Sequence, residues 1–302
     1  MDNQDEEVHQ PQEVYNQKNS EEYKEIESQW IVIQNELKTK HITHDQIDWV
    51  IPNNNNNSNS TSTSTTTSTT LKYVGGVDIS FVKDNDEDAC ASLIILEYPS
   101  LKVVHKEMEF VKLDLPYIPG FLAFRECPSL TRLIDRVKTQ HPRFYPQVLL
   151  VDGNGFLHPR AFGLACHLGV LCDLPTIGIG KTFFHVDGLD TKAVKTAFSQ
   201  QCKQAGDHYD LTGDSGTVWG SAVLSHINSK NPIFVSVGHR LSLASSLQVV
   251  QACTTSNRIP EPVRQADLLS RDFIRKNYKP SPIPSPTTTT TATTTSTTTT
   301  NE

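Results

Sequence analysis

The 302-residue sequence lacks several features that mark common protein classes. Its six cysteines include no CxxC pair, which argues against a zinc ribbon or a disulfide framework and predicts small core residues in a reducing compartment. No apolar run approaches the length of a membrane span, and the first residues are acidic, unlike a signal peptide. We therefore expect no membrane association and a cytoplasmic location, with the nucleus as the alternative.

The sequence also lacks an overall excess of basic charge, since its formal net charge is −7. The acidic excess lies in the flanks, whereas the segment between Leu71 and Lys279 carries slightly more basic than acidic residues. A slightly basic core tolerates a polyanionic substrate but does not require one. Charge alone therefore leaves the substrate class open.

Three stretches contain too little apolar surface to offset the entropy lost on folding. They are an acidic start, an internal run of Asn, Ser and Thr, and a Thr-rich end. The predicted division is a disordered N-terminus (1–19), a helical segment of the core (20–52), a disordered insertion (53–70), a single folded domain (71–280) and a disordered tail (281–302).

The apolar periodicity predicts an α/β fold. Residues 20–40 place Trp30 and Ile33 at helical spacing, as expected of an amphipathic helix. From Tyr73, three runs rich in β-branched residues predict an antiparallel three-strand start. The apolar segments QVLLVD and PTIGIG then predict buried parallel strands that alternate with helices. The result is a mixed central sheet flanked by helices on both faces, with a less regular region over 190–233.

Four acidic residues occur where strands or helices should end: Asp78, Glu126, Asp152 and Asp267. Most of them follow apolar runs that should be buried, and a buried carboxylate almost always has a partner. When several carboxylates converge, a divalent cation is the usual partner, and oxygen ligands suit Mg²⁺ or Mn²⁺. This pattern predicts a metal-dependent enzyme that acts on phosphate esters.

Each acidic residue also has an ordinary interpretation. Asp78 could lie on a solvated strand face, although Asp is disfavoured inside strands, which favours a ligand. Asp152 precedes Gly153 and could equally be a turn residue. Glu126 and Asp267 fall on predicted helices beside arginines, so that the residues alone favour a surface position.

Basic and histidine side chains follow two of the same strands. Lys181 ends the PTIGIG strand, where it could contact a scissile phosphate or its attacking water, or simply lie at the surface. His158 and Arg160 are expected to start the next helix, where phosphate binds well. His239 closes another strand and is a minor candidate, because lone histidines are usually structural.

The segment PYIPG forms a rigid loop before the first helix of the domain. Its prolines, Pro116 and Pro119, restrict the backbone around Tyr117 and Ile118. The functional interpretation is a wedge that separates bases or stacks on them. The alternative is an ordinary connection with Tyr117 packed in the core.

Taken together, these motifs resemble the endonuclease V family. The resemblance extends from Tyr73 to about Lys276 and is carried by VGGVDISF, PYIPGFLAFRE, LLVDGNGFLHPRAFGLACHLGV, DLPTIGIGK, GDSGTVWG, VSVGHRLSL and IPEPVRQAD. The DGNG segment and Asp267 resemble the eukaryotic branch. The resemblance implies a ribonuclease H-like fold with its catalytic domain at 71–280. It also implies hydrolysis of the second phosphodiester 3′ to inosine, leaving 3′-hydroxyl and 5′-phosphate ends.

The resemblance also implies roles for individual residues. Asp78, Glu126 and Asp152 would bind Mg²⁺, with Mn²⁺ as a substitute, and Asp267 would complete the acidic set. Lys181 would orient water or phosphate, with His158 close by. The residues implied for substrate binding are the wedge loop (Pro116, Tyr117, Ile118 and Pro119) and main-chain groups that form a base pocket (Leu122, Gly163 and Leu164).

The expected partner is inosine-containing single-stranded RNA, because eukaryotic members of this family act chiefly on RNA. The alternative is a repair nuclease for deoxyinosine in DNA, since the contact to a 2′-hydroxyl that separates the two cannot be located in a sequence. A third hypothesis is a non-catalytic protein that binds inosine-containing RNA, but the complete acidic set argues against it. We expect a monomer.

Overall fold

The computed structural model describes residues 21–51 and 69–279. The segments 1–19, 53–68 and 281–302, for which the sequence predicts disorder, lie outside these residues. In chain order the elements are α2 (Glu21–Lys38), β1 (Trp49–Val50), β2 (Thr69–Thr70), β3 (Tyr73–Phe81), β4 (Asp88–Glu97), β5 (Lys102–Lys112), α3 (Leu122–Gln140), η1 (Pro142–Phe144), β6 (Val148–Asp152), α4 (Leu164–Cys172), β7 (Thr176–Gly180), α5 (Thr191–Gln201), β8 (His208–Thr212), β9 (Val218–Val223), β10 (Ile233–His239), α6 (Leu243–Ala252) and α7 (Glu261–Asn277).

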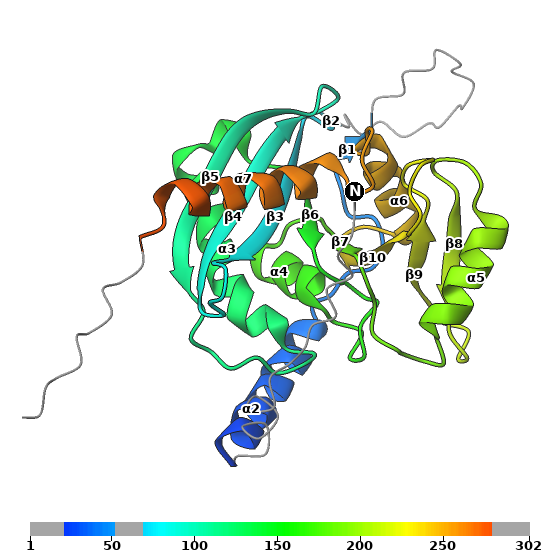
Figure 1. The fold of residues 1–302 in the computed structure, drawn as a ribbon, viewed down its shortest axis with the longest axis horizontal. Coiled ribbons are helices and arrows are strands. Elements are labelled where there is room, and N and C mark those ends of the chain that lie inside the picture. Colours follow the sequence, from blue (N-terminus) through cyan, green and yellow to red (C-terminus); the bar gives the residue numbers. More distant parts are fainter. Residues whose placement is uncertain (1–20, 52–68, 280–302) are drawn as a thin grey trace, which may run out of the picture.

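One eight-stranded sheet runs through the molecule in the order β5-β4-β3-β6-β7-β10-β9-β8 (Figure 1). The first three strands of the domain pair antiparallel, and β3, β6 and β7 pair parallel. The predicted mixed α/β sheet, with its antiparallel start, is confirmed. Beyond β7 the strands β10, β9 and β8 add antiparallel, which the sequence patterns did not reveal.

Helices cover both faces of this sheet, because its central strands are apolar on both sides. On one face α3 and α4 pack over a core that includes Leu93, Leu133 and Val151. On the other face α6 and α7 pack over cores that include Val235 and Val263. In Figure 1 the orange helix α7 crosses β3, β4 and β5. The continuous apolar strands were therefore correctly interpreted as doubly buried.

Helix α7 lies unusually close to β3, and a glycine permits this approach. A Cβ at Gly76 would lie 2.0 Å from the carbonyl oxygen of Pro262, so that no larger residue fits without moving the helix. Further along the same two elements, the hydroxyls of Ser80 and Ser270 lie 2.6 Å apart. This contact places the middle of α7, and with it Asp267, beside the end of β3.

The structure corrects several local predictions. In α2, Trp30 is buried as expected, but Ile33 is 45% exposed and Gln34 is buried in its place. The Gln34 amide donates to the carbonyl oxygen of Phe162, so that a polar contact and not an apolar one fixes this turn of the helix. The pattern of apolar residues could not show this, because it treats glutamine as a surface residue.

Two boundaries also differ. Thr69 and Thr70 were expected to belong to the disordered insertion, but they form β2, which pairs parallel with β1. The amide of Thr69 donates to the carbonyl oxygen of Asp48, and this backbone pairing needs no apolar side chain. Strand β8 was not expected, because its half-exposed sequence HYDLT lacks the apolar run that marks the central strands.

The cysteines agree with the prediction of small core residues. All six are free, and five of them are buried. Over residues 21–51 and 69–279, no helix combines the length and the apolar character that crossing a membrane requires.

Candidate active site

The four acidic residues predicted from the sequence converge on one open pocket of about 980 Å³. Asp78 lies on β3, Asp152 at the end of β6, Glu126 on α3 and Asp267 on α7. Because β3 and β6 are parallel neighbours, their carboxyl ends meet at one edge of the sheet, where sites in such folds form. The first turns of α3 and the middle of α7 close the pocket from either side.

Asp78 is only 9% exposed and is held by two hydroxyls from the α7 side of the sheet. The Oγ atoms of Ser80 and Ser270 donate to its Oδ2 at 2.8 Å and 3.3 Å. Burial, reinforced by the charge of Asp152, raises the pKa of Asp78 to about 6. The carboxylate is thus oriented by hydrogen bonds, while no basic side chain among the described residues forms an ion pair with it.

Glu126 reaches the pocket from the opposite face, although the sequence alone favoured a surface position. It is 8% exposed, and burial, together with the charges of Asp78 and Asp152, raises its pKa to about 8. Asp78 and Glu126 form no ion pair with a basic side chain in the described part of the chain. A carboxylate in such a position is stable only when a positive charge or a proton joins it.

Lys181, which follows β7, enters the same pocket. Its Nζ lies 2.8 Å from Asp152 Oδ2. Burial lowers the pKa of Lys181, but the charges of Asp152, Asp78 and Asp267 outweigh this and raise it above its usual value. Lys181 is therefore cationic at neutral pH and acts as a donor and a positive charge, not as a base.

The donor set fits a hard divalent cation. Lys181 pairs with Asp152 and Arg271 with Asp267, which leaves two buried carboxyl groups uncompensated. The pocket is open, and no three of the four carboxylates have oxygen atoms that all lie within 4.8 Å of one another. A cation bound among these carboxylates would therefore draw their oxygen atoms closer together. All of its acidic ligands are oxygens, as Mg²⁺ and Mn²⁺ prefer.

A second pocket of about 180 Å³ adjoins the first. The two are neighbours because Asp152 and Lys181 line the acidic pocket while the next residues in the chain, Gly153 and Thr182, line the smaller one. Of the residues predicted to bind substrate, four line the smaller pocket: Tyr117, Leu122, Gly163 and Leu164.

Gly163 permits the close backbone packing of this smaller pocket. A Cβ at Gly163 would lie 2.4 Å from the carbonyl oxygen of Asn154, so only glycine lets the two segments approach. The Gly163 amide donates to the carbonyl oxygen of Gly155 at 2.9 Å. Part of the main chain expected to face a base is therefore engaged in holding the pocket together.

The PYIPG loop divides between the pocket and the core. Tyr117 is half-buried and lines the smaller pocket, whereas Ile118 is 7% exposed and packs with Trp30 and Phe121. Pro116 is half-buried and Pro119 is exposed. Of the two side chains at the centre of the predicted wedge, only Tyr117 lines the smaller pocket, because Ile118 packs against Trp30 of α2.

His158 was expected near the carboxylates at a helix start, but it lies elsewhere. It precedes α4 by several residues and lines the smaller pocket, where its ring packs edge-on against Phe184. Its Nδ1 accepts from the backbone amide of Arg160. Burial, with the nearby Arg160 charge, lowers the pKa of His158 to about 4, so the ring is neutral at physiological pH.

The other two basic candidates are structural. The guanidinium of Arg160 donates to the side chains of Gln34 and Asn35, which ties it to α2. His239 is 2% exposed and pairs in register with Thr176 at the start of β7, the opposite end from Lys181. Neither side chain lines either pocket.

Comparison with known proteins agrees with this geometry. The sequence model of the Endonuclease V family matches residues 55–268. Human Endonuclease V is 51% identical over 207 residues, which cover 68% of this chain and 73% of the human protein. The crystal structure of the human catalytic domain superposes with a TM-score of 0.74 at 45% identity, covering 83% of this chain and 97% of that one.

The chain belongs to the endonuclease V family. It is therefore a nuclease that hydrolyses phosphodiesters, and its similarity to the human and mouse proteins places it in the eukaryotic branch. A further neighbour is Ciona intestinalis Endonuclease V in complex with a 23mer DNA containing an inosine followed by a ribo-adenosine. It has a TM-score of 0.72 at 36% identity and covers 83% of this chain and 98% of that chain. Endonuclease V enzymes are in general metal-dependent, and the acidic pocket suits such chemistry.

Three residues of this endonuclease V site escaped the sequence analysis. Asn154, Thr182 and Phe184 line the smaller pocket, and the buried Asn154 Oδ1 has no hydrogen-bond partner among the residues that the structure describes. The DGNG turn after a buried strand was a signal for Asn154, since a polar side chain directly beside a predicted ligand is well placed to face substrate. Phe184 carried no signal, because a single aromatic residue in a loop is common.

Proposed function

We propose that this protein is a Mg²⁺-dependent endoribonuclease that cleaves the second phosphodiester 3′ to inosine in single-stranded RNA. The products would carry 3′-hydroxyl and 5′-phosphate ends. The observation that supports the proposal is the adjacency of the two pockets, one of them acidic and open and the other small and partly enclosed. Such a pair suits a reaction in which a base is held apart while a neighbouring phosphate reacts.

Asp78, Glu126 and Asp152 would hold Mg²⁺, with Asp267 behind them and Mn²⁺ as a substitute. A bound divalent cation lowers the pKa of water and stabilises negative charge on phosphoryl oxygens. The hydroxyls of Ser80 and Ser270 fix the orientation of Asp78 from outside the ligand set. Lys181 would donate to a phosphate oxygen or position the attacking water, since it remains protonated.

The smaller pocket would accept the hypoxanthine base. Tyr117 at its rim would stack on the neighbouring base, and the backbone around Leu122, Gly163 and Leu164 would surround the flipped one. The neutral ring of His158 and the apolar ring of Phe184 present no charge to it. An uncharged pocket suits an uncharged base, and hydrogen-bond pattern would then separate hypoxanthine from adenine.

The relative bound to nucleic acid bears on the choice between RNA and DNA. Its oligonucleotide carries one ribonucleotide directly after the inosine. In the cleavage proposed here, that sugar holds the 3′-oxygen that leaves, so a 2′-hydroxyl there would lie next to the reacting phosphate. This supports RNA as the preferred substrate. The rest of that oligonucleotide is DNA, which favours a deoxyinosine-directed activity as the second candidate.

We further propose that residues 71–280 form the catalytic domain and act as a monomer in the cytoplasm.

The decisive experiment compares matched single-stranded RNA and DNA oligonucleotides, each with one inosine, in Mg²⁺ and in EDTA. We expect faster Mg²⁺-dependent cutting of RNA, one nucleotide beyond the inosine, and no cutting by the Asp152→Asn variant. Faster cutting of DNA would favour the repair function. Binding of the oligonucleotides without cutting of either would indicate a non-catalytic inosine-binding protein.

A further inference from the structure

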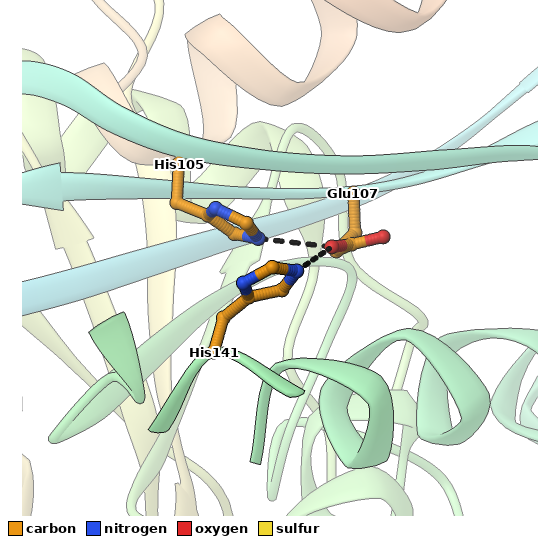
Figure 2. Close-up of side chains that lie close together, drawn as sticks. All are labelled: His105, Glu107 and His141. Atoms are coloured by element: carbon orange, nitrogen blue, oxygen red, sulfur yellow. Dashed lines mark hydrogen bonds and ion pairs between the residues drawn. The ribbon is translucent and has the colours of Figure 1, made fainter. Parts of the chain in front are cut away.

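A second group of metal-binding side chains lies outside both pockets. His105, Glu107 and His141 bring one ligand atom each within 4.8 Å of one another (Figure 2). The Nε2 atoms of His105 and His141 lie 2.9 Å and 3.8 Å from the same oxygen, Glu107 Oε1. Within residues 21–51 and 69–279 this is the one group of three or more such side chains that meets that distance.

The backbone sets this convergence. His105 and Glu107 are two residues apart on β5, so their side chains point to the same face of the strand. His141 directly follows α3, and its amide donates to the carbonyl oxygen of Val137. Figure 2 shows both rings turned toward the carboxylate of Glu107, one from the strand and one from the end of the helix.

The neighbours hold these side chains in place. Arg136 Nη1 lies 3.2 Å from Glu107 Oε2, the carboxylate oxygen that faces away from the histidines. The ring of His105 stacks on Phe144 at a centroid distance of 5.2 Å. A hydrogen bond to a ligating carboxylate is a usual outer-sphere support of a metal site, and the stacking limits rotation of the His105 ring. The exposed fraction of the side chain is 15% for His105, 12% for Glu107 and 44% for His141, so one side remains open to water.

We propose that His105, Glu107 and His141 form a binding site for Zn²⁺. Two imidazoles and one carboxylate, with a water in the fourth position, are a tetrahedral zinc donor set. With bonds of roughly 2.0–2.1 Å, tetrahedral ligand atoms are separated by about 3.4 Å, which lies between the two nitrogen–oxygen distances observed here. Nitrogen donors also distinguish this site from the all-oxygen acidic pocket, so the two sites would take different metals.

The zinc site is separate from the catalytic pocket. Glu107 is in register with Leu93 and, through it, with Val77, and both of these pack in the core beneath α3. Asp78, the next residue, points to the other face, where Ser270 of α7 contacts it. The proposal therefore does not depend on the proposed nuclease specificity.

Zinc here would join the end of α3 to the edge strand β5. The same helix carries Glu126 near its start, so the metal would fix the far end of an element that contributes to the catalytic pocket. Without a metal, the side chains would be an ion-pair and hydrogen-bond network in which Arg136 and His105 share Glu107. A measurement of metal binding distinguishes the zinc site from this metal-free network.

The test is titration of the full chain with Zn²⁺ and with Co²⁺, in the Asp152→Asn background so that the acidic pocket is weakened. We expect one tight Zn²⁺ by calorimetry and a visible absorption spectrum of tetrahedral Co²⁺. His141→Ala should weaken binding at least about tenfold and abolish the Co²⁺ spectrum, because it removes a direct ligand. His141→Cys, which retains a zinc ligand, should restore tight binding.

His44→Ala is the matched control, because His44 is exposed and lies outside the cluster. It should leave the affinity and the spectrum unchanged. Equal Zn²⁺ affinity for His141→Ala and the parent, or a Co²⁺ spectrum that survives the substitution, would overturn the proposal. A thermal unfolding midpoint that rises with Zn²⁺ in the parent but not in His141→Ala would support it and would show that both proteins are folded.

Discussion

The two adjoining pockets differ in almost every physical respect. The acidic pocket is large and open, and it gathers carboxylates from β3, α3, β6 and α7. The smaller pocket is about 180 Å³, is lined by glycines and by apolar or neutral side chains, and includes His158. The proposed function assigns chemistry to the first pocket and recognition to the second, so changes in one should leave the other largely intact.

The pKa shifts in the two pockets also have opposite directions. Burial raises the pKa values of Asp78 and Glu126, whereas it lowers that of His158. In each case the uncharged form is favoured, but the acidic pocket can recover its charge when a cation enters. The smaller pocket has no such compensation and remains neutral.

The largest expected effect is in the acidic pocket. Asp152→Ala should reduce kcat at least about a thousandfold, because it removes both a metal ligand and the partner of Lys181. Affinity for an inosine oligonucleotide should survive within a few fold, as measured by anisotropy. Asp86→Ala is the control, since Asp86 is an exposed carboxylate on the rim of the same pocket. Equal losses in both variants would argue against specific ligation.

The next largest effect should be on the pH dependence of protein stability, which we expect to differ in direction between the two pockets. The folded pKa of Glu126 is raised, so in EDTA the stability linked to this group is present below its ordinary value of 4.5 and lost as pH rises toward 8. Glu126→Gln should remove that loss, changing the stability difference between pH 5 and pH 8 by on the order of 3 kcal/mol.

The His158 contribution runs the other way, because its folded pKa is lowered. Its stability is present above the ordinary value of 6.5 and is lost as pH falls toward 4. His158→Asn should therefore reduce the loss in acid and leave the alkaline side unchanged. Thermal unfolding midpoints recorded across pH 4–8 test the predictions for Glu126→Gln and for His158→Asn. If the midpoints of the two variants changed with pH in the same way, the predicted opposite pH dependence would be wrong.

Lys181 should show an intermediate effect on catalysis. Lys181→Ala should lower kcat by about a hundredfold with little change in KM, as expected for the loss of one donor to a developing charge. Lys181→Arg should recover part of the rate, because it keeps the positive charge beside Asp152. A rise in KM with unchanged kcat would place Lys181 in substrate binding instead.

The smallest expected effect is at the rim of the smaller pocket. Tyr117→Ala should raise KM by about tenfold, within the range for loss of one base-stacking contact, and should leave kcat at saturation close to that of the parent. Tyr117→Phe, which keeps the ring, should behave like the parent. If Tyr117→Ala had an unchanged KM, Tyr117 would be a packing residue only.

Much of the acidic pocket could be predicted from sequence, because parallel strands place their carboxyl ends together and a buried carboxylate after such a strand is conspicuous. Asp152 follows such a strand, although a turn residue was an equally good interpretation, and Asp78 was favoured as a ligand because Asp is disfavoured inside a strand. Glu126 and Asp267 were not, since on a helix an acidic residue beside an arginine is usually exposed. Their positions depend on how α3 and α7 pack, and only the family resemblance indicated them.

The smaller pocket was harder to predict for a different reason. It depends on a buried glutamine in α2, on the burial of Ile118 beneath that helix and on a close backbone contact at Gly163. None of these leaves a periodic signal. His158 was misplaced because α4 begins later than its apolar pattern indicated, so the histidine belongs to the preceding loop.

The pairs Asp152–Gly153 and Lys181–Thr182 have a consequence for where the enzyme cuts. In each pair the first residue lines the acidic pocket and the second lines the smaller one, so that a single peptide bond at the end of a buried strand joins the two pockets. Under the proposed function, the covalent geometry of these two strand ends would set the separation between the held base and the reacting phosphate. A change in the lining of the smaller pocket would then alter which base is accepted, whereas a change in the position of the cut would require these strand ends to move.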